Sequence, residues 1–138
     1  MFEWLTLHVA SLVMTALLFG AMAAHVGLFT RWVFKFLKPD AAGEFLGKVF
    51  PSYYRTGTVI AILAAAPLLP GQSYGVEIGI LLGVAAAFIL SVRFLLPLMR
   101  RAKEAEDKKR FAALHGISQA LHLTQFAGVA VVLVRLAQ

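Results

Sequence analysis

Four long apolar segments alternate with short polar ones along the 138-residue chain. The apolar segments run from about residue 4 to 29, 54 to 69, 76 to 98 and 111 to 136. A helix needs about 20 residues to cross the hydrocarbon core of a bilayer, and only the second segment falls short. Without that segment, however, one polar loop would lie on the wrong side of the membrane. The pattern predicts an all-α integral membrane protein: a four-helix antiparallel bundle in a single domain, residues 1–138.

The charges of two polar segments, residues 31–52 and 99–110, predict the orientation of the chain. Both segments contain several Lys and Arg residues, whereas residues 70–76 contain none. By the positive-inside rule, the two basic segments are cytoplasmic loops and both termini face outward. Trp4 and Trp32 then bracket the first span as interfacial anchors. We therefore expect a multi-pass protein of the inner (plasma) membrane.

The first apolar segment is expected to be a retained span and not a cleaved signal. Residues 21–23, Ala-Met-Ala, resemble a signal-peptidase site, but the chain before them lacks Lys and Arg and carries Glu3. A secretory signal begins with a basic region.

The first cytoplasmic segment contains a further predicted element. Pro39 followed by Asp40 is typical of a helix start, and the apolar residues 45, 46, 49 and 50 then fall on one side. This predicts a short amphipathic helix in the membrane interface. Pro51 closes it or opens the second span.

Composition supports a membrane protein and excludes several other classes. Apolar residues make up 60% of the chain and charged residues 14%, against roughly 25% charged residues in a soluble domain. Cysteine is absent, which excludes disulfides, thiolate metal sites and cysteine nucleophiles. The net charge of +6 fits basic loops near a bilayer better than a nucleic-acid partner.

Small residues recur every four positions in each predicted helix. They are Ala16, Gly20 and Ala24; Gly57, Ala61 and Ala65; Gly75, Gly79, Gly83 and Ala87; and Gly116, Ala120, Thr124 and Gly128. Inside a membrane such residues let helices approach closely, so we expect a tight bundle. On the last helix these small residues lie on the side opposite to a row of polar residues that includes His115 and His122. That helix is then covered on both sides, which predicts a homo-oligomer or a partner membrane subunit.

Polar side chains within the spans are the candidate functional residues, because burying them in lipid is costly. At 100° per residue, one stripe of the last helix contains His115, Ser118, Gln119 and His122. One face of the first helix contains Ser11, Met14, Leu18, Met22 and His25. Counting from the cytoplasmic ends places one set of residues in a single layer: His25, Arg93, His115 and Tyr54, with Tyr53 and Arg55 at the same level. His122 lies about 10 Å deeper, and His8 lies near the opposite face.

This layer suggests cofactor chemistry. Two neutral imidazoles from different helices can ligate haem iron, copper or zinc. His25 would be one ligand and His115 or His122 the other, so that haem b or copper are the candidate cofactors. Met22 would suit Cu(I), and Arg93 would balance charge. Alternatively, the histidines only form hydrogen bonds between helices, and Arg93 extends to the headgroups.

Two segments resemble a known family. Residues 45–54 read Phe-Leu-Gly-Lys-Val-Phe-Pro-Ser-Tyr-Tyr, and residues 110–118 read Arg-Phe-Ala-Ala-Leu-His-Gly-Ile-Ser. Together they resemble the transmembrane protein 205-like family, a domain of unknown function, over residues 19–125. The resemblance implies a four-span membrane protein, and eukaryotic relatives are associated with platinum-drug resistance and with vesicle or export roles. The chain departs from the family pattern at His25 and His122.

Three interpretations of function follow. The first is a non-catalytic or accessory membrane protein that holds haem or a metal ion in the polar layer. The second is a small transporter or export factor that uses the same layer as a pathway, and the third is a structural subunit of a larger complex. An enzyme is disfavoured, because the spans contain no carboxylate pair and no Ser-His-Asp set.

Overall fold

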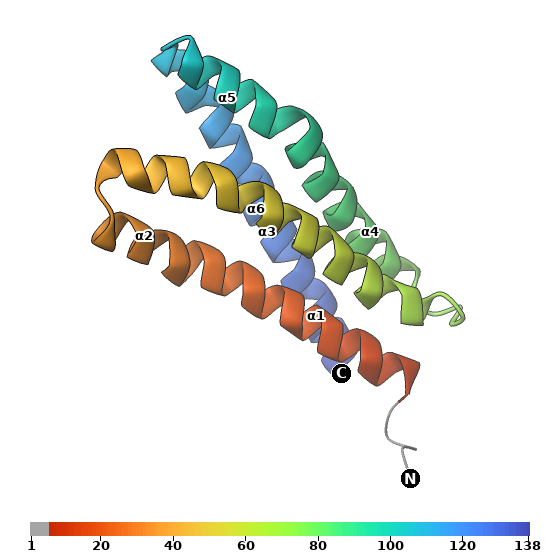
Figure 1. Cartoon of the computed structure of the whole chain (residues 1–138). Coiled ribbons are helices and arrows are strands. Elements are labelled where there is room, and N and C mark those ends of the chain that lie inside the picture. The colour runs from red at the N-terminus through yellow and green to blue at the C-terminus, as the bar shows by residue number, and fades with distance from the viewer. Residues whose placement is uncertain (1–5) are drawn as a thin grey trace.

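The computed structural model describes residues 6–138, which are helical apart from short connections (Figure 1). The predicted positions of Glu3 and Trp4 lie outside the described residues. The helical segments in chain order are α1 (Leu7–Ala24), a π-helical segment (His25–Phe29), α2 (Thr30–Phe36), α3 (Pro39–Ala65), a 3₁₀ turn (Ala66–Leu68), α4 (Gly75–Leu90), a second π-helical segment (Ser91–Leu95), α5 (Leu96–Glu104) and α6 (Lys108–Ala137).

These segments join into four packed helices of about 30 residues each, which confirms the predicted all-α four-helix fold. Three of them are long and apolar enough to cross a membrane: Leu7–Phe36, Gly75–Glu104 and Lys108–Ala137. The protein is therefore a small multi-pass helical membrane protein. The helix formed by α3 is not among the three, because its charged and polar residues, which include Asp40, Glu44, Lys48 and Arg55, make it less apolar.

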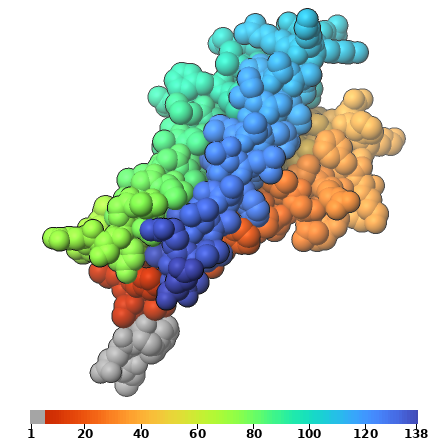
Figure 2. Space-filling model, turned by 180° about the vertical axis from the view of Figure 1, so that it is seen from behind, coloured from red at the N-terminus to blue at the C-terminus, as the bar shows by residue number. Residues whose placement is uncertain are grey.

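The four helices form two hairpins (Figures 1 and 2). The first consists of α1, α2 and α3, and the second of α4, α5 and α6. The hairpins pack together where α1 and α4 begin and α6 ends, which we call the closed end. At the other end, α2 packs against its own hairpin partner α3, and α5 against α6. There the hairpins diverge, and we call this the groove end.

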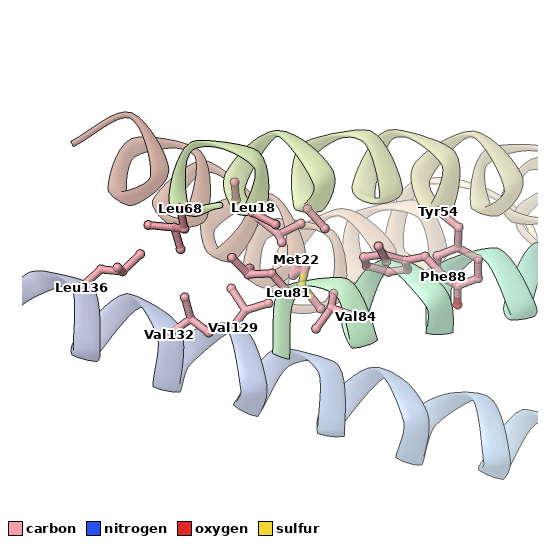
Figure 3. Packing of buried hydrophobic residues seen from close by; sticks show 14 residues of the cluster. Leu18, Met22, Tyr54, Leu68, Leu81, Val84, Phe88, Val129, Val132 and Leu136 are labelled. Carbon is pink, nitrogen blue, oxygen red and sulfur yellow. The ribbon is translucent and has the colours of Figure 1, made fainter. Parts of the chain in front are cut away.

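The hydrophobic core lies between the hairpins (Figure 3). Leu18 and Met22 of α1 contribute to it, as do Leu81 and Phe88 of α4. The predicted face of the first helix is confirmed, since Ser11, Leu18, Met22 and His25 are all buried. A close contact between the hairpins lies at Gly57, where an added Cβ would lie 2.7 Å from Phe88 Cε2. Glycine is required there because Phe88 is completely buried.

The helices extend well beyond the predicted spans. Most of the expected loop of residues 31–52 is helical, because α2 continues to Phe36 and α3 begins at Pro39. The helix start at Pro39 is thus confirmed, but no separate interfacial helix follows. Residues 39–50 are the first half of a continuous α3 that passes through Pro51. Pro51 has no N–H to donate to the carbonyl of Gly47 four residues earlier, so the helix lacks one backbone hydrogen bond there.

Only part of the small-residue pattern is used inside the bundle. On α3, Gly57, Ala61 and Ala65 are buried against the other hairpin, as predicted. On α6, Gly128 packs against Ile80, but Gly116, Ala120 and Thr124 are exposed. Gly79 and Gly83 of α4 are also exposed, with open space around them. Small residues thus contribute to the close packing of the bundle at α3 and at Gly128, while the exposed ones leave the predicted oligomer or partner subunit as a prediction.

Candidate functional site

A groove of about 360 Å³ lies between the two hairpins at the groove end. This volume is near the lower end of the range for small-molecule sites, roughly 300–1,000 Å³. Its walls come from both hairpins: His25, Val26, Thr30, Phe34, Leu46, Phe50, Tyr54, Leu96, Met99, His115, Ser118, Gln119 and His122.

Two π-helical segments border this region, one in each hairpin. His25–Phe29 follows 18 residues of α1, and Ser91–Leu95 follows 16 residues of α4. Pro97 explains the second, because it has no N–H to donate to the carbonyl of Arg93 four residues earlier. In the first, the Thr30 hydroxyl donates to the His25 carbonyl at 2.9 Å. Such insertions re-aim side chains and are frequent at functional sites.

A cluster of rings surrounds His25. Its imidazole stacks on Tyr53, with ring centroids 3.7 Å apart and planes 9° apart. Phe50 meets the same imidazole edge-on at 5.0 Å, and Phe29 stacks at 5.5 Å. The Tyr53 hydroxyl lies 2.9 Å from His122 Nε2, which links α3 to α6 across the hairpins. Tyr53 thus contacts both buried histidines: it stacks on His25 and forms a hydrogen bond with His122.

His25 retains an unused hydrogen-bonding atom. The residue is 7% exposed, and its Nε2 is buried without a hydrogen-bond partner. Within residues 6–138, the other two buried side-chain atoms of this kind are Thr15 Oγ1 and Glu77 Oε2, and neither residue lines the groove. Leaving a buried imidazole nitrogen unpaired costs about 1–3 kcal/mol. A ligand in the groove could supply the missing partner.

The walls of the groove differ in polarity. The side formed by α2, α3 and α5 is largely apolar, with Phe34, Leu46 and Met99 among its residues. The side formed by α6 contributes only polar side chains, namely His115, Ser118, Gln119 and His122. This arrangement matches a molecule that has one apolar side and one hydrogen-bonding side.

Four of the six predicted site residues line the groove: His25, Tyr54, His115 and His122. His115 is exposed and lies beside Gln119, with 3.4 Å between His115 Nε2 and Gln119 Nε2. Arg93 lies within the second π-helical segment and is exposed, outside the groove lining. Met22 lies in the hydrophobic core. The structure thus brings the aromatic and histidine residues together and leaves out the predicted arginine and methionine.

The histidines of the groove are not grouped as three ligands of one metal ion would be. Within residues 6–138, no three His, Cys, Asp or Glu side chains are grouped closely enough to hold a metal ion. One nitrogen of His122 already bonds Tyr53, and Met22 is not among the groove residues. The residues that line the groove can form hydrogen bonds and apolar contacts with a bound molecule.

Sequence reasoning selected Tyr54 and missed the role of its neighbour. Tyr53 makes both the stacking contact with His25 and the hydrogen bond with His122. Phe50, one turn earlier, was also missed. The spacing of Leu46, Phe50 and Tyr54 along one helix face was the signal that could have located this wall.

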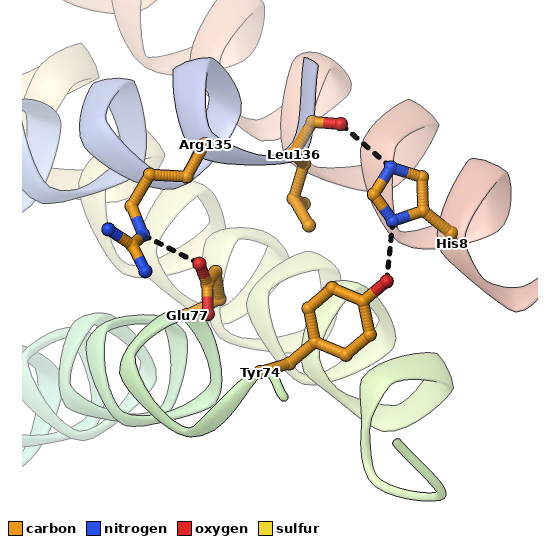
Figure 4. A network of polar contacts seen from close by, with 5 residues as sticks. All are labelled: His8, Tyr74, Glu77, Arg135 and Leu136. Atoms are coloured by element: carbon orange, nitrogen blue, oxygen red, sulfur yellow. Dashed lines mark hydrogen bonds and ion pairs between the residues drawn. The ribbon is translucent and has the colours of Figure 1, made fainter. Parts of the chain in front are cut away.

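A second polar cluster lies at the closed end (Figure 4). His8 Nε2 lies 2.7 Å from the Leu136 carbonyl and must donate to it, since a carbonyl only accepts. In the neutral ring, Nδ1 then accepts from the Tyr74 hydroxyl at 2.9 Å. Nearby, Arg135 Nε donates to the buried Glu77 carboxylate at 2.6 Å. The sequence placed His8 near this face but predicted neither partner.

Comparison with protein families gives a match over residues 13–110, to a domain of unknown function named DUF4149. The chain belongs to the DUF4149 family. This supports the resemblance seen in the sequence at the level of a domain of unknown function. Comparisons with curated proteins and with solved structures give no match. The DUF4149 region runs from the middle of α1 to the first turn of α6, and the polar α6 wall of the groove lies beyond its last residue.

Proposed function

We propose that this DUF4149 protein is non-catalytic and binds a small amphipathic molecule in the groove between its two hairpins. The observation that carries the proposal is the unpaired Nε2 of His25 in the groove wall. An unpaired buried nitrogen carries a free-energy cost, and a hydrogen-bonding group of a ligand in the groove would remove it.

The two kinds of wall define the ligand class. An apolar body fits against Phe34, Leu46 and Met99, and a hydrogen-bonding group fits between His25 and the polar side chains of α6. A molecule with this division of surfaces partitions into a membrane interface. The groove therefore serves a ligand that reaches it from the bilayer or from the adjacent aqueous phase.

Hydrogen bonding is favoured over a metal centre with three protein ligands, because no three His, Cys, Asp or Glu side chains are grouped closely enough within residues 6–138. Haem needs only one or two axial histidines, and the experiment below tests for it directly. The excess of Lys and Arg in residues 31–52 and 99–110 supports the further proposal that the groove end faces the cytoplasm from the inner membrane. Both termini would then lie outside.

The decisive experiment compares the small molecules that remain bound to wild-type protein and to Ser118→Trp. Ser118 lines the groove, so an indole there fills it. The matched control is Ile117→Trp, because Ile117 is 56% exposed on the same helix. Both variants and the wild type are purified in one detergent, extracted and analysed by mass spectrometry, together with a visible absorption spectrum and metal analysis.

We expect an amphipathic molecule in near-stoichiometric amount with wild type and Ile117→Trp, and its loss in Ser118→Trp. A Soret band or stoichiometric copper that disappears in the same variant would keep the groove as a binding site and replace the ligand class by a cofactor. Identical extracts from all three proteins would overturn the proposal.

A second candidate function is that of a subunit in a larger assembly or homo-oligomer. It is supported by the outward-facing small residues Gly79 and Gly83 on α4 and Ala120 on α6, since such positions permit close helix contact in lipid. Cross-linking in native membranes, with Gly83→Leu as the interface variant, tests it. Unchanged cross-linking in that variant would remove the α4 face from consideration.

A further inference from the structure

The two hairpins are structural repeats of one another. Each has a first helix interrupted by a five-residue π-helical segment at a similar distance from its start, followed by a second helix of similar length. Both first helices begin at the closed end, so the two halves run in the same direction through the bundle (Figure 1). Parallel repeats with a binding site at their interface are a common construction of membrane transporters.

Buried hydrogen bonds fasten each half internally. In the first half, Ser11 Oγ of α1 donates to the Ala64 carbonyl of α3 at 2.6 Å. In the second half, Gln125 Nε2 of α6 donates to the Val84 carbonyl of α4 at 3.0 Å. Each half thus has a buried side chain bonded to the backbone of its own partner helix.

Polar links between the halves are concentrated at two levels. At the closed end, His8 of the first half bonds both Tyr74 and the Leu136 carbonyl of the second (Figure 4). Beside the groove, Tyr53 bonds His122. Between these levels the interface consists of small and apolar side chains such as Ala61, Ala65 and Leu81. Such a surface offers few directional bonds to hold the two halves in one arrangement.

We propose that the two halves rock against each other, so that the groove is open in turn to the two sides of the membrane and carries its amphipathic ligand across. The present structure is the state open at the groove end, and His8 latches the closed end. Opening that end breaks the two His8 bonds, while α2 and α3 approach α5 and α6 and close the groove. This inference rests on the proposed ligand-binding function and adds to it the movement of the ligand across the membrane.

The absence of cysteine from the chain makes single-cysteine labelling a direct test. Val132→Cys reports on the closed end, because Val132 is fully buried in the core there. Ser118→Cys reports on the groove. Each is made in the full chain, reconstituted in phosphatidylcholine–phosphatidylglycerol vesicles and treated with a membrane-impermeant maleimide from each side in turn.

The hydrogen bonds of His8 at the closed end are then removed in two steps. Tyr74→Phe removes one bond of His8, and His8→Ala removes both. We expect labelling of Val132→Cys to rise by about fivefold for each bond lost, the equilibrium change given by one net hydrogen bond. Labelling of Ser118→Cys should fall in the same order. The control is Ser11→Ala, which removes a bond within one half and should leave both labelling rates unchanged.

A reciprocal change in the two labelling rates supports rocking. A rise at Val132→Cys without a fall at Ser118→Cys means local loosening and overturns it, as do unchanged rates in both latch variants. These outcomes are independent of the ligand test. If Ser118→Trp loses its bound molecule while the labelling rates stay constant, the groove remains a binding site and only the rocking fails.

Discussion

The histidines at the closed end and at the groove end of the bundle differ in how many of their ring nitrogens are hydrogen-bonded. At the closed end, both ring nitrogens of His8 are bonded, and Arg135 neutralises the buried Glu77. At the groove end, one nitrogen of His25 is buried without a partner and His115 is exposed. Histidine therefore links helices at both ends, since His122 bonds Tyr53 beside the groove, but an unpaired buried ring nitrogen is found at the groove end.

Packing follows the same division. Leucine, valine and alanine side chains from both hairpins fill the closed end, whereas the groove end leaves about 360 Å³ between them. The tight packing that stabilises the bundle and the groove proposed to bind a ligand thus lie in different parts of it. The comparison predicts that equivalent substitutions will have unequal effects at the two ends.

The largest difference is expected between two leucine truncations. Leu81→Ala removes a fully buried side chain from the closed half of the core and should lower the free energy of unfolding by about 2–5 kcal/mol. Leu96→Ala removes a half-buried side chain that lines the groove, where a space already exists, and should cost about 1 kcal/mol. Unfolding in mixed micelles with rising dodecyl sulfate measures both. Equal losses would show that the groove wall is packed as tightly as the core.

A smaller difference is expected between two glycine substitutions. Gly57→Ala places a methyl group 2.7 Å from an atom of Phe88, a ring that cannot move into solvent, and overpacking of this kind costs about 1–3 kcal/mol. Gly83→Ala meets nothing within 4 Å and should be neutral or stabilising by up to about 1 kcal/mol, because alanine is the better helix former. The same unfolding measurement applies. Destabilisation by Gly83→Ala would instead indicate that a neighbouring molecule covers this face.

The helices and part of the groove could be predicted from the sequence, and the reasons for the failures are physical. His115 and His122 were placed correctly because α6 is a regular helix, in which 100° per residue holds over its whole length. Arg93 was assigned to the layer by its depth alone, and depth does not fix the direction of a side chain; the residue lies in a π-helical segment and is exposed outside the groove lining. The links His8–Tyr74 and Tyr53–His122 join residues 66 and 69 positions apart, and no periodicity within one helix contains that information.

The smallest expected effect on stability is also the one that separates binding from packing most sharply. His25→Phe keeps a flat ring against Tyr53 and Phe50 and removes the unpaired Nε2. Because an unsatisfied buried nitrogen costs about 1–3 kcal/mol, the variant should be as stable as wild type or up to about 1 kcal/mol more stable, while losing the molecule retained in the groove.

The matched variant Tyr53→Phe removes a satisfied bond to His122, and its free energy of unfolding should fall by about 0.5–1.5 kcal/mol. Thermal unfolding and extraction of bound molecules from the same preparations test both expectations. If His25→Phe is strongly destabilised, the imidazole is a structural group whose nitrogen has a partner in the folded protein, and the unpaired nitrogen no longer argues for a ligand.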